Sequence, residues 1–458
     1  MNRAILLSFL TTLTALPTMA EGLPPATPLV HLSANTTCSR CEGTALPGRV
    51  VAQPAAKWGI ISDLPESFKG YGVLYSTADM LPPNGAPDEM RRQIRAENGP
   101  AAGFRGIDGG FDVFLFHLNK TAGATQRIVV YARNLGTSPA TVKPRQVIKS
   151  EGLIGTVHDF ESELGARVLK DDWDRPLQSV VIPSGQGRVV GYGRVFGAGA
   201  KEGPDSRANV NCFGYVRAEL APPAAGTAAN LLVEVIAIPA TPIAGIDAEA
   251  AKWTGKGVES TDEVSMTGPP QGCALGRAVG TYPNFAWMSD IVTVDATTLT
   301  DGGTTFPIGL PAVQTPDCPE ARQTQDFALR PGYTRFDTVG NYMVPYETRF
   351  ILTNPGATDL QVDLTMGKQG ADIGLAYAVA SAPFVPGNAT PEDSFKKLSI
   401  DPKDIKTQWA GPKQASKEKT MLPRPVTVAP GKAVAVRARF MILGNSSLPF
   451  TLAVKPVK

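Results

Sequence analysis

The chain of 458 residues lacks an excess of charge of either sign. It has 44 lysines and arginines against 42 aspartates and glutamates, a formal net charge of +2, and only 19% of its residues are charged. Proteins hold a nucleic-acid backbone with strongly basic faces, so this balance predicts no nucleic-acid partner. Long apolar runs are also scarce. Beyond residue 20 the longest is Leu231–Ile238, which Glu234 interrupts and which is too short to span a membrane.

Histidine is almost absent, which removes most metal and nucleophile motifs. His31, His117 and His158 are the three histidines, and none belongs to a His-Glu-x-x-His zinc motif or accompanies a Gly-x-Ser-x-Gly turn. Alternation along a strand predicted at 111–118 groups His117 with apolar residues, which predicts a core or strand-edge position. The glycine clusters also lack the following helix that a phosphate site needs. The sequence therefore assigns no catalytic residue and no cofactor, and favours a protein that is not an enzyme.

Cysteine is sparse and odd in number, so in an oxidising compartment one thiol would stay unpaired or pair outside the chain. The five are Cys38, Cys41, Cys212, Cys273 and Cys318. For the close pair Cys38 and Cys41, a thioredoxin-like site would need a flanking strand and helix, and a zinc site would need a second pair of ligands. A c-type haem would need histidine where Glu42 stands. We expect a local disulfide between Cys38 and Cys41; the pairing of the other three is open.

What is present at the N-terminus is a secretory signal pattern over residues 1–20. A positive start at Asn2-Arg3 precedes an apolar run from Ala4 to Leu16, and the segment ends on the small residue Ala20. The run is shorter than the roughly 20 residues of a membrane-spanning helix. No cysteine directly follows the cleavage point, so a lipid anchor is not expected. The mature chain is predicted to reach the periplasm, the outer cell surface or the medium.

Glycine and proline are abundant, at 46 and 40 residues. Turn chemistry of this density does not suit helical bundles, coiled coils or helical repeats, and it predicts many short strands. The segments 362–366 and 434–440 show the period-two alternation of a half-buried strand. Hairpins with one apolar face need a second sheet to cover that face. We therefore predict an all-β chain of the β-sandwich type.

The two halves of the sequence repeat the same order of strands and turns. Residues 128–136, a strand that ends in Asn-x-Gly, match residues 350–356, and residues 180–185 match residues 426–431, each before an alternating strand. Chance could produce such a repeat in any all-β chain, but its order favours a duplication. The prediction is two tandem, immunoglobulin-like β-sandwiches with loop excursions.

The predicted organisation is a signal peptide (1–20), a proline-rich leader with the Cys-x-x-Cys pair (21–56), a first sandwich (57–240), a linker of small residues (241–280) and a second sandwich (281–458). Each sandwich carries one excursion. The first, 152–177, is expected to hold a short helix capped by His158 or Asp159. The second, 383–425, is rich in lysine and proline and is expected to be a surface loop with little regular structure.

Three carboxylates around Trp173 form the densest acidic group: Asp171, Asp172 and Asp174. Alternate aspartates in a loop can supply the oxygens that Ca²⁺ needs, although the closing glutamate of a full calcium loop is missing. A solvated loop and a glycosidase acid/base pair are the alternatives, and the second would need two carboxylates that face each other across a cleft. The tryptophans either anchor loops and cores or stack on sugar rings. They are Trp58, Trp173, Trp253, Trp287 and Trp409.

Several turns and strand edges resemble those of a known bacterial family. They are Gly72–Thr77 with Leu81–Gly85, Gly110–Phe114, Asn134-x-Gly136, Val181–Gly185, Gly340–Tyr342 with Tyr346, and Asn354–Gly356. From Lys57 to the C-terminus the chain is similar to the family catalogued as domain of unknown function thirty-three-seventy, found largely in cyanobacteria and their neighbours. The resemblance implies an exported, all-β bacterial protein and carries over no functional residue.

Together these patterns predict an exported cell-envelope protein that acts as a structural or binding module. Its expected partner is an envelope polysaccharide or another envelope protein. The alternative is a protein that binds or modifies a polysaccharide, with the loop aromatics and the three aspartates as its site. A third hypothesis is a redox protein that uses Cys38 and Cys41.

Overall fold

The computed structural model describes the chain from residue 31 onward, with gaps. The described residues are 31–32, 43–44, 46–51, 56–63, 67–78, 106–121, 124–151, 157–174, 178–194, 210–222, 229–260, 279–283, 286–308, 343–367, 373–385, 390–410, 419–443 and 450–457. The predicted signal peptide lies outside these residues. So do Cys38 and Cys41, the predicted disulfide, and the two cysteines Cys273 and Cys318.

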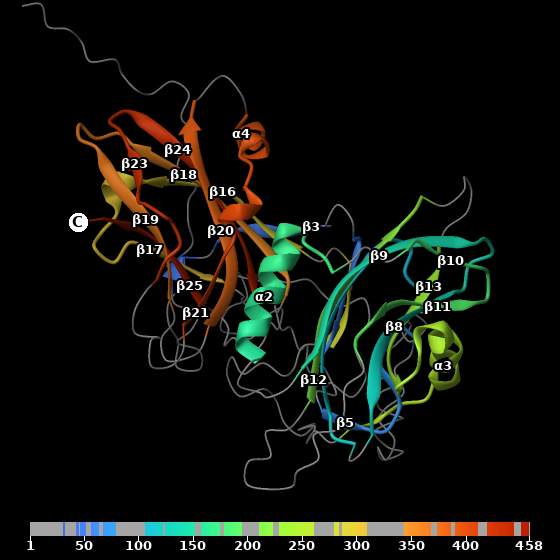
Figure 1. Cartoon of the computed structure of the whole chain (residues 1–458). Helices are drawn as coiled ribbons and strands as arrows, with labels where there is room; N and C mark the ends of the chain where they lie inside the picture. Colours follow the sequence, from blue (N-terminus) through green and yellow to red (C-terminus); the bar gives the residue numbers. More distant parts are fainter. Residues whose placement is uncertain are drawn as a thin grey trace, which may run out of the picture.

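The described residues are mostly β-strand with few helices, so the predicted all-β class is confirmed (Figure 1). No helix within these ranges combines the length and the apolar character that crossing a membrane requires. The helical elements are α2 (Val157–Lys170), η4 (Ile243–Gly245), α3 (Ile246–Trp253), η5 (Ala296–Thr298), α4 (Pro391–Lys397) and η6 (Pro402–Asp404). A small two-stranded sheet consists of β1 (His31–Leu32) and β2 (Gly43–Thr44).

In the first half, an eight-stranded and a four-stranded sheet contribute to one hydrophobic core. Alternation sets this up: Phe111, Val113 and Leu115 of one strand enter the core, while the residues between them face the other way. The eight strands are β4 (Trp58–Ser62), β5 (Ser67–Lys69), β7 (Phe111–Asn119), β9 (Ala140–Glu151), β10 (Val180–Ile182), β12 (Val210–Leu220), β14 (Glu259–Ser260) and β15 (Val279–Pro283). The four are β6 (Gly72–Ser76), β8 (Gln126–Asn134), β11 (Gly187–Tyr192) and β13 (Leu231–Pro239).

In the second half, a six-stranded and a five-stranded sheet contribute to a separate core, with Phe350 and Phe440 among its largest side chains. The six strands are β3 (Gly48–Val51), β16 (Ala286–Asp295), β18 (Pro345–Asn354), β20 (Ile373–Phe384), β21 (Lys406–Ala410) and β24 (Lys432–Ile442). The five are β17 (Thr304–Ile308), β19 (Leu360–Gly367), β22 (Lys419–Thr420), β23 (Val426–Val428) and β25 (Phe450–Pro456).

The repeated Asn-x-Gly turns have the same hydrogen bonds in both halves. The side-chain amide of Asn134 donates to the backbone carbonyl of Ile182 at 2.9 Å, and that of Asn354 donates to the carbonyl of Val428 at 2.7 Å. Each amide also donates to the carbonyl four residues on, and each side-chain oxygen accepts from the glycine N–H two residues on. Both asparagines are fully buried. An amide side chain is therefore required at the same point of each half.

Helix α2 lies between the two groups of sheets (Figure 1). Leu164 and Val168 of this helix belong to a third apolar cluster, to which the eight-stranded and the six-stranded sheet also contribute. The approach is closest at Gly165, where a β-carbon would stand 2.5 Å from Leu443 Cδ2 and 3.0 Å from Ala376 Cβ. Thus the helix of the first half buries its apolar side chains against the outer faces of both halves.

Both predicted excursions differ from the structure. The first holds a longer helix than expected, because α2 starts at Val157 and places His158 and Asp159 inside its first turn instead of at its cap. The second, 383–425, contains α4, η6 and β21 and is not an irregular loop. Its helix forms because the Thr390 side chain accepts from the N–H of Asp393 and because the buried Phe395 fixes one face to the sheet.

The predicted linker and boundaries also differ from the structure. In the described part of 241–280, α3 packs Ile246 and Ala250 against the outer face of the four-stranded sheet. Strand pairing crosses the predicted boundaries in both directions: β3, from the leader, pairs with β16 of the second half, and β15 pairs with β4 of the first half. The small residues of this segment suggested a linker. Small residues also let a helix pack closely against a sheet, which is the role they have in α3.

Candidate functional site

The predicted carboxylate turn directly follows α2. Asp171 adopts a positive φ of 56°, accepts a hydrogen bond from the indole N–H of Trp173 at 2.6 Å, and pairs with Arg145 at 2.9 Å. Asp172 and Asp174 face a different partner, since both lie near the Arg167 guanidinium of α2. The three carboxylates lie in one turn, as their sequence positions require, and each of them has an arginine partner.

These ion pairs bear on the candidate calcium site. Arg167 lies 3.4 Å from Asp172 and 2.7 Å from Asp174, so a cation bound there would compete with a guanidinium group. Over the described ranges, no three His, Cys, Asp or Glu side chains lie together in a way that could hold a metal ion. The geometry favours a turn that fixes the end of α2.

Arg217 of β12 joins this turn to the outer face of the eight-stranded sheet. Its guanidinium donates to both oxygens of Asp112, at 2.8 and 2.9 Å, and Tyr215 donates to the same carboxylate at 2.7 Å. Asp112 is 0% exposed. Burial alone would lower the pKa of Arg217, but the hydrogen bonds and the charge of Asp112 outweigh it and raise that pKa. The guanidinium also lies 5.2 Å from the ring centroid of Trp173.

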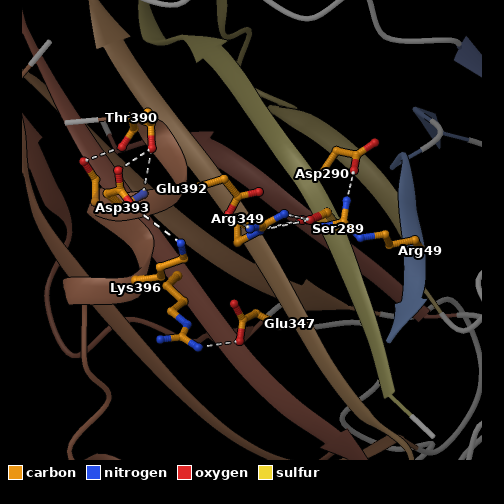
Figure 2. A network of polar contacts seen from close by, with 11 residues as sticks. Arg49, Ser289, Asp290, Glu347, Arg349, Thr390, Glu392, Asp393 and Lys396 are labelled. Atoms are coloured by element: carbon orange, nitrogen blue, oxygen red, sulfur yellow. Dashed lines mark hydrogen bonds and ion pairs between the residues drawn. The ribbon is translucent and has the colours of Figure 1, made fainter. Parts of the chain in front are cut away.

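A second polar network covers the outer face of the six-stranded sheet (Figure 2). The Arg349 side chain is buried and donates twice to the backbone carbonyl of Ser289, at 2.9 and 2.5 Å. It also donates to Glu392 of α4 at 2.6 Å. Since β16 and β18 are neighbouring parallel strands, Arg349 ties α4 to both of them.

On the described part of this face, the guanidinium of Arg439 lacks a hydrogen-bonded partner. Arg437 donates to Glu347 at 2.7 Å and to the backbone carbonyl of Leu398 at 2.9 Å. Arg439 lies 3.9 Å from Glu347, beyond hydrogen-bond reach, and 42% of its side chain is exposed. Burial lowers the pKa of Arg439; the charge of Glu347 opposes this, and the charges of Arg437 and Arg217 add to it. Positive charge therefore accumulates at this point.

Both networks border the apolar cluster around α2. Arg217 follows two residues after Tyr215, which belongs to that cluster, and Arg439 precedes Met441, also a member, by two residues. The β-ladder places Arg439 opposite Ala378, a third member. We call Arg217, Arg437 and Arg439, which come from both halves of the chain, the arginine border.

Three tryptophans are half-buried and share one environment. In each, the indole N–H donates to a carboxylate at 2.6 to 3.0 Å, and a lysine or arginine lies 5.2 to 5.9 Å from the ring centroid. They are Trp58 with Asp108 and Lys57, Trp173 with Asp171 and Arg217, and Trp253 with Glu249 and Lys256. Trp287 is buried in the second core, and the side chain of Trp409 lies outside the described residues. These contacts favour anchored rings.

Two further sequence candidates lie in the first core. His117 is 0% exposed, and its Nε2 lies 2.8 Å from the Ser62 hydroxyl, as expected of a satisfied core histidine. Cys212 is its cross-strand neighbour and is also 0% exposed. Burial of this kind keeps the imidazole and the thiol away from solvent.

A groove of about 410 Å³ opens between β20 and the segment 422–427. Its lining is largely apolar, with Arg424 as the charged member: Val379, Ser381, Ala382, Pro383, Leu422, Pro423, Arg424, Pro425, Val426, Thr427 and Val434. No sequence pattern indicated this groove. Its lining comes from segments of two different sheets, which are distant in the sequence.

Comparison with known proteins adds little to this geometry. No family model matches the chain. No curated protein matches it either. Among solved structures, the CUB1-EGF-CUB2 domains of rat MASP-1 are 9% identical, with 85% of this chain and 99% of that chain covered and a TM-score of 0.14. Lac15 from a marine microbial metagenome is 10% identical, with 77% and 54% covered and a TM-score of 0.13. The insecticidal delta-endotoxin Cry8Ea1 from Bacillus thuringiensis is 11% identical, with 77% and 55% covered and a TM-score of 0.16. Likenesses this distant carry no argument, and the resemblance to domain of unknown function thirty-three-seventy stays a prediction.

Proposed function

We propose that the chain is an exported cell-envelope protein, built as two tandem immunoglobulin-like β-sandwiches, that works as a structural or binding module. The signal pattern of residues 1–20 supports export to the periplasm, the outer surface or the medium. Two separate cores, each supplied by a pair of sheets, support the sandwich arrangement. The third cluster around α2 supports a rigid unit of both halves.

One observation carries the choice of a module over an enzyme: the carboxylates of the candidate site are held by donors. Asp112 accepts from Arg217 and Tyr215, and Asp171 is bound by Arg145 and Trp173. A general acid or base must reach a proton of the substrate with its own oxygens, and the oxygens of these two carboxylates already accept hydrogen bonds from side chains of the protein. Such pairs fix the shape of a surface.

Export is tested by expressing the full chain in a bacterial host and measuring the mass and location of the product. We expect a species that begins after Ala20 in the periplasm or the medium. An intact N-terminus in the cytoplasm would contradict the proposal.

Binding is tested on a glycan array with the processed protein, with and without calcium. Binding to one class of glycan that persists in a chelator supports the binding role without a calcium site. No binding under either condition favours the purely structural role.

A second candidate is a protein that binds or modifies a polysaccharide. The half-buried Trp173, fixed between Asp171 and Arg217 at the arginine border, favours it, because an indole with a polar rim suits a sugar ring. Release of reducing ends from an array-positive glycan would establish modification. Binding without release would restrict the protein to recognition.

A further inference from the structure

In the arginine border, Arg217 has a carboxylate of its own, whereas Arg437 and Arg439 share Glu347. The guanidinium of Arg437 lies 2.7 Å from the Glu347 carboxylate, whereas that of Arg439 lies 3.9 Å from the same carboxylate. The charge of Arg217 on β12 also acts on Arg439, and the carboxylate that pairs with Arg217, Asp112, already accepts three hydrogen bonds. The charge of Arg439 is therefore the least compensated of the three.

Arg439 is also placed to reach a ligand. Its side chain is 42% exposed, whereas the side chains of Arg217 and Arg437 are 11% and 21% exposed. Arg217 and Arg437, the two less exposed arginines, fix the site, because each guanidinium is held by a carboxylate. The exposed Arg439 keeps its donors for another group. A pre-positioned, half-desolvated guanidinium with free donors suits a carboxylate or a sulfate.

We propose that Arg439, with Arg217 and Arg437 beside it, binds the anionic group of an acidic saccharide, either a carboxylate or a sulfate. This inference rests on the proposed binding function and names its ligand class. Trp173 lies on Arg217 and offers the apolar surface that a sugar ring needs next to the charged contact. Both halves of the chain contribute, so the site exists only in the docked arrangement.

The test is calorimetric titration of the processed full chain at low ionic strength, where charged contacts are least screened. Oligogalacturonate provides the carboxylate, sulfated dextran oligomers provide the sulfate, and unmodified dextran is the neutral probe. We expect at least one acidic probe to bind and neutral dextran not to bind. Arg439→Gln should weaken that binding about tenfold or more, the loss of one charge-assisted contact.

Two variants complete the design. Arg439→Lys keeps the charge and should retain more affinity than Arg439→Gln. Arg133→Gln removes an exposed arginine of β8 in the four-stranded sheet and should leave affinity unchanged. Equal binding of the acidic probes by wild type and Arg439→Gln, or no acidic binding, overturns the inference. If a neutral glycan on the array still binds both proteins, the binding module stands without this site; if no glycan binds at all, both the inference and the binding role fail.

Discussion

Replacing Gly165 tests whether α2 really joins the two halves. An added β-carbon would stand 2.5 Å from Leu443 Cδ2 and 3.0 Å from Ala376 Cβ. Leu443 is 0% exposed, and a β-carbon such as that of Ala376 cannot rotate away, so something must shift. Overpacking of this kind costs about 1–3 kcal/mol. Alanine in place of glycine inside a helix gains about 1 kcal/mol.

The overpacking cost and the gain in helix propensity together predict that Gly165→Ala lowers the free energy of unfolding by about 1 kcal/mol. Gly165→Val should lower it by about 3 kcal/mol, because valine has a poor helix propensity and two more methyl groups than alanine. The assay is urea unfolding followed by tryptophan fluorescence, since Trp173 lies in the turn after α2 and reports on this contact. Lys170→Ala, on the exposed end of the same helix, is the control and should change little.

A double-mutant cycle with Leu443→Val sharpens the test. If the clash is real, shortening Leu443 should make Gly165→Ala less harmful, with a coupling of about 1 kcal/mol. If Gly165→Ala alone raised the stability by about 1 kcal/mol, the full gain in helix propensity, the close approach at Gly165 would be refuted. The rigid docking of the two halves would be refuted with it.

Three more results are expected. Burial raises the pKa of Glu234, against hydrogen bonds from Ser76 and Gly255, so the native state holds this proton more tightly than the unfolded chain. The free energy of unfolding should therefore fall as the pH rises from 4.5, the ordinary pKa, through the raised native pKa. Glu234→Gln should abolish this fall in urea titrations at several pH values. The same pH dependence of stability in wild type and variant would contradict the expectation. Asn134→Ala and Asn354→Ala should each cost about 2 kcal/mol in the same assay because buried carbonyls lose their donor, and markedly unequal losses would count against equivalent turns. Asp112→Ala should cost about 3–5 kcal/mol because it leaves Arg217 buried without its carboxylate, and Asp112→Ala combined with Arg217→Met should recover part of that loss; a double variant no better than the single one would show that the charge is not the cause.

Local rules were enough to predict the strands and the repeated turns. Asn134 and Asn354 stand at the same step of a strand–turn–strand unit, and the glycines that close each unit, Gly185 and Gly431, have φ values of 73° and 72°. Side-chain alternation and turn chemistry depend only on near neighbours in sequence. The all-β class could therefore be read from the chain.

The parts that sequence could not predict depend on distant pairings. Arg437 and Arg439 were recognisable as the polar face of an alternating strand, but nothing local showed that this face meets α4 and another sheet. The Asp171 turn was found as an acidic group, yet its partners Arg145 and Arg217 come from strands β9 and β12. Charged residues at alternate positions of a strand normally face solvent. Arginines at such positions are the one signal that could have indicated that the second face of this sheet is covered as well.

The exchange of β3 and β15 between the halves sets an order on biosynthesis. On the ribosome, β3 emerges early, but its partner β16 is made only after the whole of the first half. Until β16 is present, the short N-terminal strand has no ladder to join. Because β15 stays with the first half while β3 joins the second, a gene cut between β15 and β16 should leave the second half without its edge strand β3.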